Sequence, residues 1–383
     1  MTAAPVPAVA PAVAVVTRPV RVAVVGLGWA GRSLWLPRLR DHAAFDVVAA
    51  VDPDPAARPV LGGDEPGTPA IEILRDPAAL APETVDLAVV AVPNHLHSPV
   101  AIRLLKAGIP VFLEKPVCLS TVEADALAAA ELAGGAVLLA GSAARSRADT
   151  SALYGLAGEL GVIRHVDVSW VRARGVPDAG GWFTQRQLAG GGALVDLGWH
   201  LLDAVAPFVG SAGFLQAVGT ASSDFVTDAR WSAAWRHDEP VESRAGGDVE
   251  DTIRAFLVTA GGVSVSLRAS WASHEALDAT VIRVEGSAGT AELRCTFGFS
   301  PNRRPGSSLS FTTGGQVRMV DLPNEAIGAE YGRQLDELPG LLADPNQRGV
   351  AIAQARSTIG AIEQIYDSAS ARPSRIPSAS AGI

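Results

Sequence analysis

A glycine-rich turn, GLGWAG at residues 26–31, constrains the fold of this chain more than any other feature. The Val-rich run RVAVVG (21–26) precedes it and a segment of helical character, WAGRSLWLPRLRDH (29–42), comes after it, so the predicted order is strand, turn, helix. In a GxGxxG turn the first glycine permits a tight bend, the second lets a pyrophosphate approach the backbone, and the third lets the helix lie close to the strand. The turn predicts a dinucleotide site made of Gly26, Leu27, Gly28, Trp29, Ala30 and Gly31. Pro37 is expected to kink or restart the helix.

An acidic residue ends the second apolar run, FDVVAAVD (45–52). Asp52 lies 21 residues after Gly31, where a carboxylate accepts hydrogen bonds from the adenosine ribose hydroxyls. Its charge repels a 2′-phosphate, and the nearest arginine after it is Arg58. These residues favour NAD over NADP as the cofactor.

Three more apolar runs, at 86–93, 109–116 and 136–141, alternate with helical patterns and predict a parallel, doubly wound sheet. Ligands bind beyond the carboxyl ends of such strands. The residues there are Pro93, Asn94 and His97 after one strand and Glu114, Lys115 and Pro116 after the next. A proline after Lys115 favours an extended backbone that holds the lysine near the cofactor and substrate.

A second glycine-rich stretch, GGGALVDLGWHLLD (190–203), carries polar residues in an apolar helical pattern. Asp196, His200 and Asp203 share one face if the segment is a regular helix. Such a pair of acid and histidine is often structural, and Asp203 is equally consistent with orienting His200, reaching the substrate, or an ordinary structural acid. Trp182 precedes this segment closely and is a candidate for substrate binding.

The second half of the chain is rich in short β-type runs between residues 163 and 297, several of them separated by turns at 260–262 and 286–289, and this pattern predicts antiparallel hairpins. Two late helical segments, at 330–343 and 350–369, would close the domain. We expect a disordered tail at 1–19, a nucleotide-binding domain at 20–142, a second domain at 143–370 whose last helices return to the first, and a flexible tail at 371–383.

These motifs in this order, GLGWAG, VPNHLHSPVAIRLLKAGIPVFLEKP and GGGALVDLGWHLLD, resemble those of the Gfo/Idh/MocA family, which includes glucose-fructose oxidoreductase and inositol dehydrogenase. The similarity runs from about residue 20 to 370. It implies an α/β Rossmann domain followed by an α+β domain on a large, mostly antiparallel open sheet. It also implies oxidoreductase activity on sugars, cyclitols and related polyols, and a homo-oligomer, dimer or tetramer, formed through the outer face of the second sheet.

The resemblance assigns roles to individual residues. Lys115, Asp196 and His200 are implied to be the catalytic set, and these three with Trp182 the substrate-binding set. Asn94 and His97 are expected near the nicotinamide ribose, and Arg145 stands where members often have an arginine at the cofactor. The usual neighbouring aromatic residue is missing here.

Oxidation of a secondary alcohol requires a base for the hydroxyl proton. We expect His200 to serve as that base, and as the acid in the reverse reaction. Asp196 would orient the histidine or the substrate hydroxyl. Lys115 would stabilise the developing alkoxide and lower the pKa of His200.

Composition and charge argue against several classes of protein. A net charge of −9 with no block of Lys or Arg argues against nucleic acid binding. No uninterrupted apolar run reaches the ~18 residues of a membrane span. The two cysteines, Cys118 and Cys295, lack the spacing of a disulfide framework or zinc site, so we expect no metal and a cytoplasmic location.

The acidic segment 223–251 with Trp231 and Trp235 leaves the substrate open. The favoured interpretation is a solvated loop with structural tryptophans. The alternative is that its tryptophans and acids contact the substrate, which would then be an amino sugar or an aminoglycoside-type intermediate. Two other functions stay open: an NAD-dependent glycoside hydrolase that oxidises its substrate transiently, and a non-catalytic nucleotide-sensing regulator. A non-catalytic regulator is expected to have lost the lysine or the histidine of the catalytic set. Both Lys115 and His200 are present, so this alternative is disfavoured.

Overall fold

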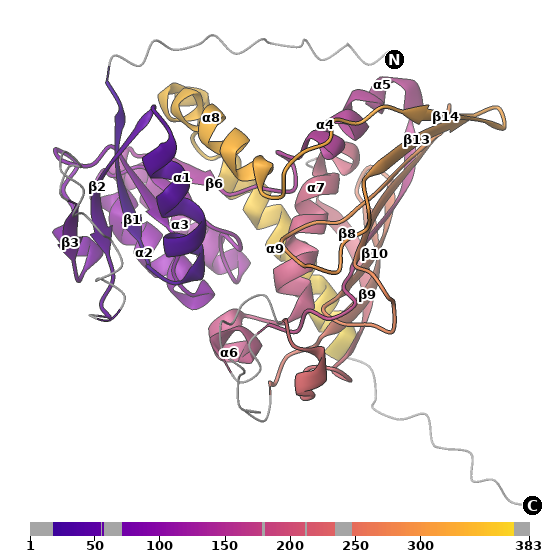
Figure 1. Cartoon of the computed structure of the whole chain (residues 1–383), viewed down its shortest axis with the longest axis horizontal. Helices are drawn as coiled ribbons and strands as arrows, with labels where there is room; N and C mark the ends of the chain where they lie inside the picture. The colour runs from indigo at the N-terminus through magenta and orange to yellow at the C-terminus, as the bar shows by residue number, and fades with distance from the viewer. Residues whose placement is uncertain are drawn as a thin grey trace, which may run out of the picture.

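The computed structural model describes residues 18–54, 56, 71–177, 181–210, 213–233 and 247–370. These residues form two sheets with their helices, seen side by side in Figure 1, with α8 and α9 between them. Most of both predicted tails, Arg58 and Trp235 lie outside the described residues.

The first sheet has six described strands, all parallel, in the order β3-β2-β1-β4-β5-β6. The strands are β1 Val20–Val25, β2 Phe45–Val51, β3 Glu72–Leu74, β4 Leu87–Val90, β5 Val111–Leu113 and β6 Leu138–Ala140. The strand order reverses between β1 and β4, and a crevice for ligands opens at the carboxyl ends there. The predicted doubly wound sheet is confirmed, while the short, exposed β3 was not predicted.

Helices cover both faces of this sheet. Successive side chains of a buried strand point to opposite faces, so each face carries apolar side chains that pack against helices. Val22 and Val24 of β1 pack in one hydrophobic cluster with α1 (Leu36–Asp41) and α8 (Ala329–Ala343), so the chain returns to the first sheet near its end. Ala23 and Val25 face the opposite cluster, with α2 (Asn94–Lys106) and α3 (Thr121–Gly134).

The first helix restarts at Pro37, as predicted. A π-helical turn, Ala30–Trp35, comes first, and the Leu36 N–H donates to the Gly31 carbonyl. Pro37 is then the second residue of α1; because it has no N–H, it cannot continue the hydrogen-bond series of the π-helical turn, and the chain changes there to an α-helix.

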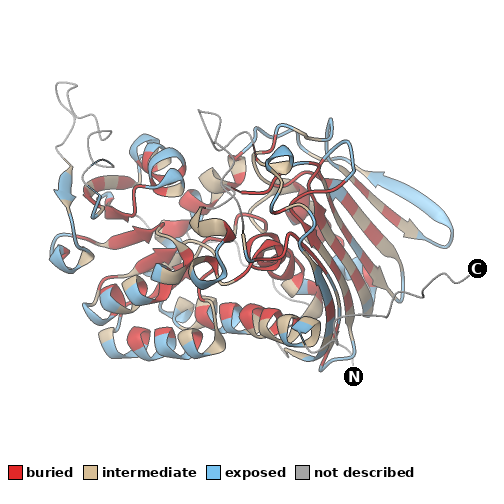
Figure 2. Cartoon of the chain, turned by 90° about the horizontal axis from the view of Figure 1, so that it is seen from below, coloured by how far each residue is buried: buried red, intermediate tan, exposed pale blue. Residues whose placement is uncertain are grey.

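The second sheet has eight described strands in the order β14-β13-β12-β11-β7-β10-β9-β8. All neighbours are antiparallel except β7 and β10. The strands are β7 Ile163–Val171, β8 Phe214–Ser222, β9 Thr252–Thr259, β10 Ser264–Ser270, β11 Ala279–Gly286, β12 Thr290–Cys295, β13 Ser308–Thr313 and β14 Gln316–Val320. The predicted hairpins β9–β10 and β11–β12 are confirmed. The outer hairpin β13–β14 was not predicted, and Figure 2 shows its exposed end.

One face of the second sheet is covered by α7 (Trp199–Val209), which lies against β7. The long helix α9 (Val350–Ser370) packs against α3, α7 and β8, and so contacts both domains. Short helices complete the domain: α4 Ala148–Gly155, α5 Ala157–Leu160 and α6 Arg186–Ala189. In the described chain, one stretch, Arg186–Val209, is long and apolar enough to span a membrane, but most of it is buried inside the protein, as in a core helix.

Candidate active site

A cavity of about 690 Å³ lies at the carboxyl ends of β1, β4 and β5, between the two domains. The residues that line it come from the glycine turn of the first domain and from α7 and β7 of the second, among other segments. All four residues predicted to bind substrate, Lys115, Trp182, Asp196 and His200, line this cavity. The fold therefore brings together side chains from segments that are far apart in the sequence.

The glycine turn has room for a pyrophosphate. A Cβ added to Gly28, which lines the cavity, would meet no atom within 4 Å. A Cβ on Gly31 would instead collide with the Gly26 carbonyl oxygen, so this glycine permits close packing of helix and strand. Gly26, Trp29 and Ala30 also line the cavity, whereas Leu27 and Gly31 do not. The open space at Gly28 fits the diphosphate of a dinucleotide.

Asp52 is held at the neighbouring edge of the cavity. Its Oδ2 accepts a hydrogen bond from the Leu27 N–H at 2.7 Å, and its Oδ1 accepts one from the Asp54 N–H at 2.8 Å. The acid therefore fixes the glycine turn and also lines the cavity. Arg75, after β3, lines the same cavity, a proximity that the sequence spacing did not indicate.

Pro93, Asn94 and His97 all line the cavity, but two of their side chains have protein partners. The Asn94 Nδ2 donates to the Ala189 carbonyl at 3.0 Å and so joins α2 to α6. The His97 ring is buried, with Nδ1 2.6 Å from the Pro116 carbonyl oxygen and Nε2 2.8 Å from that of Val92. Both ring nitrogens of His97 thus face backbone oxygens of the two loops that form this wall.

Lys115 and Asp196 form the centre of the site. The Lys115 Nζ lies 2.6 Å from the Asp196 Oδ1, with side-chain exposures of 17% and 4%. The second oxygen, Oδ2, accepts a hydrogen bond from the Trp271 Nε1 at 2.9 Å. The Glu114 carboxylate accepts a hydrogen bond from the Lys115 backbone N–H at 3.0 Å and another from the Trp35 indole N–H at 2.7 Å. Burial raises the pKa of Glu114.

The polar residues of the GGGALVDLGWHLLD segment do not share one helical face. Asp196 lies in a π-helical turn, Leu194–Gly198, that precedes α7. The extra residue in this turn rotates α7 relative to the direction that a regular helix would give it. Asp203, three residues after His200 on α7, pairs with Arg145 (Oδ1 to Nε, 3.0 Å) and does not line the cavity.

Arg145 also lies outside the cavity lining. Its guanidinium donates to the Asp203 carbonyl and to the Gln354 side chain. Its predicted contact with the cofactor therefore has no support in the geometry, and the Arg145–Asp203 pair joins the loop after β6 to α7.

His200 faces the cavity from α7, where its environment disfavours the charged imidazolium. Burial, followed by the positive charge of Lys115, lowers its pKa to about 3, against the opposing effect of Asp196. The imidazole is therefore neutral at neutral pH and able to accept a proton. Its ring lies 5.7 Å from that of Trp170.

Besides the predicted Trp182, the second domain contributes cavity residues that the sequence did not single out. Trp182 and Phe183 pack together with ring centroids 4.4 Å apart, and both line the cavity. Trp170 and Arg172, at the end of β7, and Phe299 line it as well. Phe299 contacts Trp29 of the glycine turn at 5.5 Å, so an aromatic pair bridges the two domains at the edge of the cavity.

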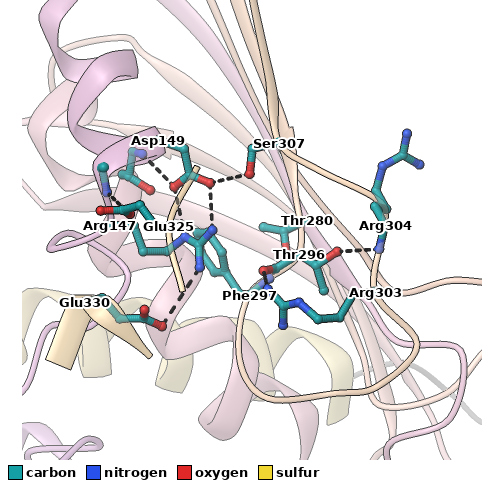
Figure 3. Close-up of polar contacts among 12 residues, drawn as sticks. Arg147, Asp149, Thr280, Thr296, Phe297, Arg303, Arg304, Ser307, Glu325 and Glu330 are labelled. Carbon is teal, nitrogen blue, oxygen red and sulfur yellow. Dashed lines mark hydrogen bonds and ion pairs between the residues drawn. The ribbon is translucent and has the colours of Figure 1, made fainter. Parts of the chain in front are cut away.

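The loop 296–307, between β12 and β13, is fixed by the polar cluster drawn in Figure 3. Arg303 donates to the carbonyls of Thr296 and Gly298. The guanidinium of Arg147, paired with Asp149 at 2.7 Å, lies 4.8 Å from the Phe297 ring. These contacts hold Gly298 and Phe299 in the cavity wall.

Trp231 packs away from the cavity lining, on Phe225 at 4.7 Å and His274 at 5.4 Å. Part of the acidic segment around it, residues 234–246, lies outside the described residues. Among the residues that are described, no group of three or more His, Cys, Asp or Glu side chains gathers as it would around a metal ion.

Comparisons with known proteins agree with this architecture. The model of an oxidoreductase family with an NAD-binding Rossmann fold, Gfo/Idh/MocA, matches residues 20–142, and the model of that family's C-terminal domain matches residues 156–292. A protein of Amycolatopsis mediterranei (strain S699), assigned as a putative UDP-kanosamine synthase oxidoreductase subunit, is 60% identical over 350 residues, covering 91% of this chain and 96% of the relative.

Two solved structures share the fold across nearly the whole chain. GenD2 from gentamicin A biosynthesis, in complex with NAD, has a TM-score of 0.71 and 23% identity, covering 95% of this chain and 97% of its own. KijD10, a 3-ketoreductase from Actinomadura kijaniata in complex with NADP and TDP-benzene, has a TM-score of 0.70 and 19% identity, covering 92% and 98%. The chain therefore belongs to the Gfo/Idh/MocA family and is an NAD-binding oxidoreductase.

Proposed function

We propose that this protein transfers a hydride between NAD and one secondary alcohol or ketone of a sugar, in the formation of an amino sugar. The observation that carries the proposal is the Lys115–Asp196 pair beside a neutral His200, in the same cavity as the open glycine turn. The name of the 60% identical relative, which refers to a UDP-linked amino sugar, supports a nucleotide-linked hexose as the substrate.

Three side chains of the site divide the chemistry between them. NAD, when bound along the glycine turn, supplies the acceptor for the hydride that leaves the alcohol carbon. His200 takes the hydroxyl proton, so that alcohol and NAD become ketone and NADH. The Lys115 ammonium stabilises the negative charge that develops on the oxygen, and Asp196 fixes the lysine by its ion pair. In the reverse direction His200 returns the proton.

The direction we favour is oxidation. An amino group is placed on a ring carbon by amination of the ketone at that carbon. An oxidoreductase that works with an aminating enzyme therefore supplies the ketone. The protein's own product would be a keto sugar, released to a separate amination step.

NAD is the cofactor we propose over NADP, because the Asp52 carboxylate lies in the cavity wall beside the glycine turn. A ribose with free hydroxyls donates hydrogen bonds to such a carboxylate, whereas a 2′-phosphate is repelled by it.

An absorbance assay of NADH formation tests the proposal. The purified protein is given NAD with UDP-glucose, glucose, myo-inositol and amino sugars, and a hydroxylamine traps the ketone so that the oxidation proceeds. NADH formation with a sugar and a ketone adduct detected by mass spectrometry are expected. Cleavage of a glycoside without net NADH would instead indicate a hydrolase, and no reaction in either direction with any sugar or keto sugar would overturn the proposal.

A further inference from the structure

The segment that carries Asp196 is enclosed by two residues outside the cavity lining. A Cβ added to Gly191 would collide with the hydroxyl of Tyr366 on α9, and a Cβ added to Gly192 would collide with the carbonyl oxygen of Glu250. Glu250 lies two residues before β9, and neither it nor Tyr366 lines the cavity. The glycines therefore let the backbone of this segment come close to Glu250 and Tyr366.

Glu250 accepts hydrogen bonds from three consecutive N–H groups of this backbone. Its Oε1 accepts from the Gly192 N–H at 3.1 Å and from the Leu194 N–H at 3.0 Å, and its carbonyl oxygen accepts from the Ala193 N–H at 3.0 Å. These groups lie at the start of the π-helical turn, where an N–H has no helical carbonyl to donate to and a negative charge is favoured. Glu250 thus fixes the beginning of the turn.

The Glu250 carboxylate is itself held by two other helices. The Tyr366 hydroxyl of α9 donates to Oε1 at 2.7 Å, and the Arg186 Nη2 of α6 lies 3.3 Å from Oε2. Burial, together with the charge of Glu250, raises the pKa of Tyr366, so its hydroxyl remains a donor. The Glu250 side chain is only 4% exposed. Its carboxylate therefore has little freedom to leave the turn.

A short path of hydrogen bonds leads from Glu250 to the ion pair of the site. The Gly192 N–H donates to Glu250, and the Gly192 carbonyl accepts from the Asp196 N–H at 3.0 Å. The Asp196 Oδ1 in turn lies 2.6 Å from the Lys115 Nζ. The position of the Asp196 carboxylate thus depends on a backbone that Glu250 holds.

The next residue supports the same carboxylate through a second path. The Asp251 carbonyl accepts from the Trp271 N–H at 2.8 Å, and the Trp271 indole donates to the Asp196 Oδ2 at 2.9 Å. Asp251 is itself buried, and its Oδ2 accepts from the Val226 N–H at 2.9 Å. Residues 250 and 251 therefore support both the backbone and the side chain of Asp196.

We propose that Glu250 is a positioning residue of the reaction: its carboxylate fixes the backbone at 192–194 so that the Asp196 carboxylate meets the Lys115 ammonium. This inference rests on the proposed function and adds a residue on which the reaction depends. Glu250 lies outside the cavity lining and acts through Asp196. A displacement of about 1 Å in a catalytic group can lower a rate by about 100-fold.

Steady-state kinetics with the sugar and NAD measures this effect. Glu250→Ala is expected to lower kcat by about 100-fold, while the KM for the sugar and the dissociation constant of NAD change little. Glu250→Gln keeps an oxygen that accepts from the turn and should recover much of kcat. Tyr366→Phe removes one hydrogen bond to the carboxylate and should lower kcat by less, and it tests the inference if the alanine variant does not fold.

Glu131→Ala is the matched control. Glu131 is 5% exposed, and its carboxylate accepts from the N–H groups of Leu138 and Gly349 at 2.8 and 2.7 Å, but it lies outside the cavity lining and away from the turn at 192–194. This substitution should lower the melting temperature and leave kcat unchanged.

A double-mutant cycle tests whether Glu250 acts through Asp196. In an Asp196→Asn background the additional change Glu250→Ala should lower kcat by much less than it does in the wild type. Two residues that act through one contact are not additive, whereas independent ones are.

A further readout does not need turnover, because Lys106 and Lys115 are the two lysines of the chain. Lys106 is exposed at the end of α2 and serves as an internal reference. Acetylation by an N-hydroxysuccinimide ester, followed by mass spectrometry, gives the reactivity of Lys115 relative to Lys106. This ratio should rise several-fold in Glu250→Ala, as in Asp196→Asn, because the Lys115 amine loses its partner. It should not change in Glu131→Ala.

Three outcomes would overturn the inference. A loss of kcat that follows the loss of melting temperature in both alanine variants would make Glu250 a structural acid only. An equal loss of kcat in the wild-type and Asp196→Asn backgrounds would show that Glu250 does not act through Asp196. Unchanged kcat would show that the turn keeps its position without the carboxylate. Failure of the proposed function is distinct: the wild type would then form no NADH from any sugar, and the acetylation ratio would decide, since an unchanged ratio in Glu250→Ala contradicts the inference.

Discussion

The Nζ of Lys115 and the Oδ1 of Asp196 lie 2.6 Å apart although 81 residues separate them. Lys115 lies just after a strand of the first domain, and Asp196 lies in a π-helical turn of the second. Because the ion pair crosses from one domain to the other, formation of the site depends on their correct packing. Asp196 is in turn fixed by the Trp271 indole, so the pair has little freedom to separate.

Replacement of His200 by Ala should reduce turnover by roughly a hundred- to ten-thousand-fold, the usual effect of losing a proton-transfer partner. Lys115→Met should have a similar effect on turnover. Steady-state rates check both variants, and NAD affinity, measured by fluorescence quenching, should stay nearly unchanged. His165→Ala is the control, because that histidine lies on β7 with Ser264 and Asp167 as partners. Full activity of His200→Ala would refute the assignment.

The pH dependence of the rate should lack an acid limb near the ordinary histidine pKa. The pKa of His200 is lowered to about 3, so the imidazole stays neutral, and competent as a base, well below pH 6.5. A profile of kcat/KM from pH 5 to 8 tests this expectation. An acid limb near pH 6.5 that disappears in a His200 variant would contradict it.

The same shift affects stability. The folded protein binds a proton at His200 less readily than the unfolded chain, whose histidine has a pKa near 6.5. Stability from this residue is therefore fully present above pH 6.5 and is lost as the pH falls from 6.5 towards 3. The melting temperature of His200→Asn should fall less than that of the wild type over this interval. An equal fall in the two proteins would show that His200 titrates alike in the folded and unfolded states.

Asp52→Asn should shift the cofactor preference towards NADP. The substitution removes the charge that repels a 2′-phosphate and keeps an oxygen for the Leu27 N–H, while Arg75 in the same cavity provides a nearby cation. Dissociation constants for NADH and NADPH, measured by cofactor fluorescence, check this. A variant that still binds NADPH as weakly as the wild type would show that the carboxylate does not set the preference.

The outer face of the second sheet should carry a contact between copies of the chain. Val218 and Phe256 are paired across β8 and β9, with exposures of 54% and 48%. A charge at Phe256, introduced as Phe256→Asp, would oppose burial of this face and should lower the mass measured by light scattering after gel filtration. An unchanged mass would place the contact elsewhere.

The sequence predicted the parts of the site that depend on local spacing. The glycine turn, the strand before Lys115 and the pattern around Asp196 and His200 each lie within one short segment. Neither the one-residue insertion of the π-helical turn nor the pairing of Asp203 with Arg145 could be predicted from side-chain spacing.

Trp170, Arg172, Trp271 and Phe299 were missed for a different reason. They reach the site through the pairing of β7 with β10 and through the loop after β12, and neither arrangement can be derived from a local pattern. The strand that carries Trp170 and ends just before Arg172 has an ordinary alternation of buried and half-buried residues. No signal within it distinguishes the residues that line the cavity.

The buried ring of His97 connects two loops of the cavity wall. Its two nitrogens lie at the carbonyl oxygens of Val92 and Pro116, so the ring joins the loop after β4 to the residue that comes after Lys115. We expect His97 to position Lys115 rather than to bind the cofactor through its ring nitrogens. His97→Ala should therefore lower kcat and the melting temperature while the dissociation constant of NAD changes little. His97→Gln, which can reach one carbonyl, should recover part of both. A large loss of NAD affinity at unchanged kcat would show instead that the ring contacts the cofactor.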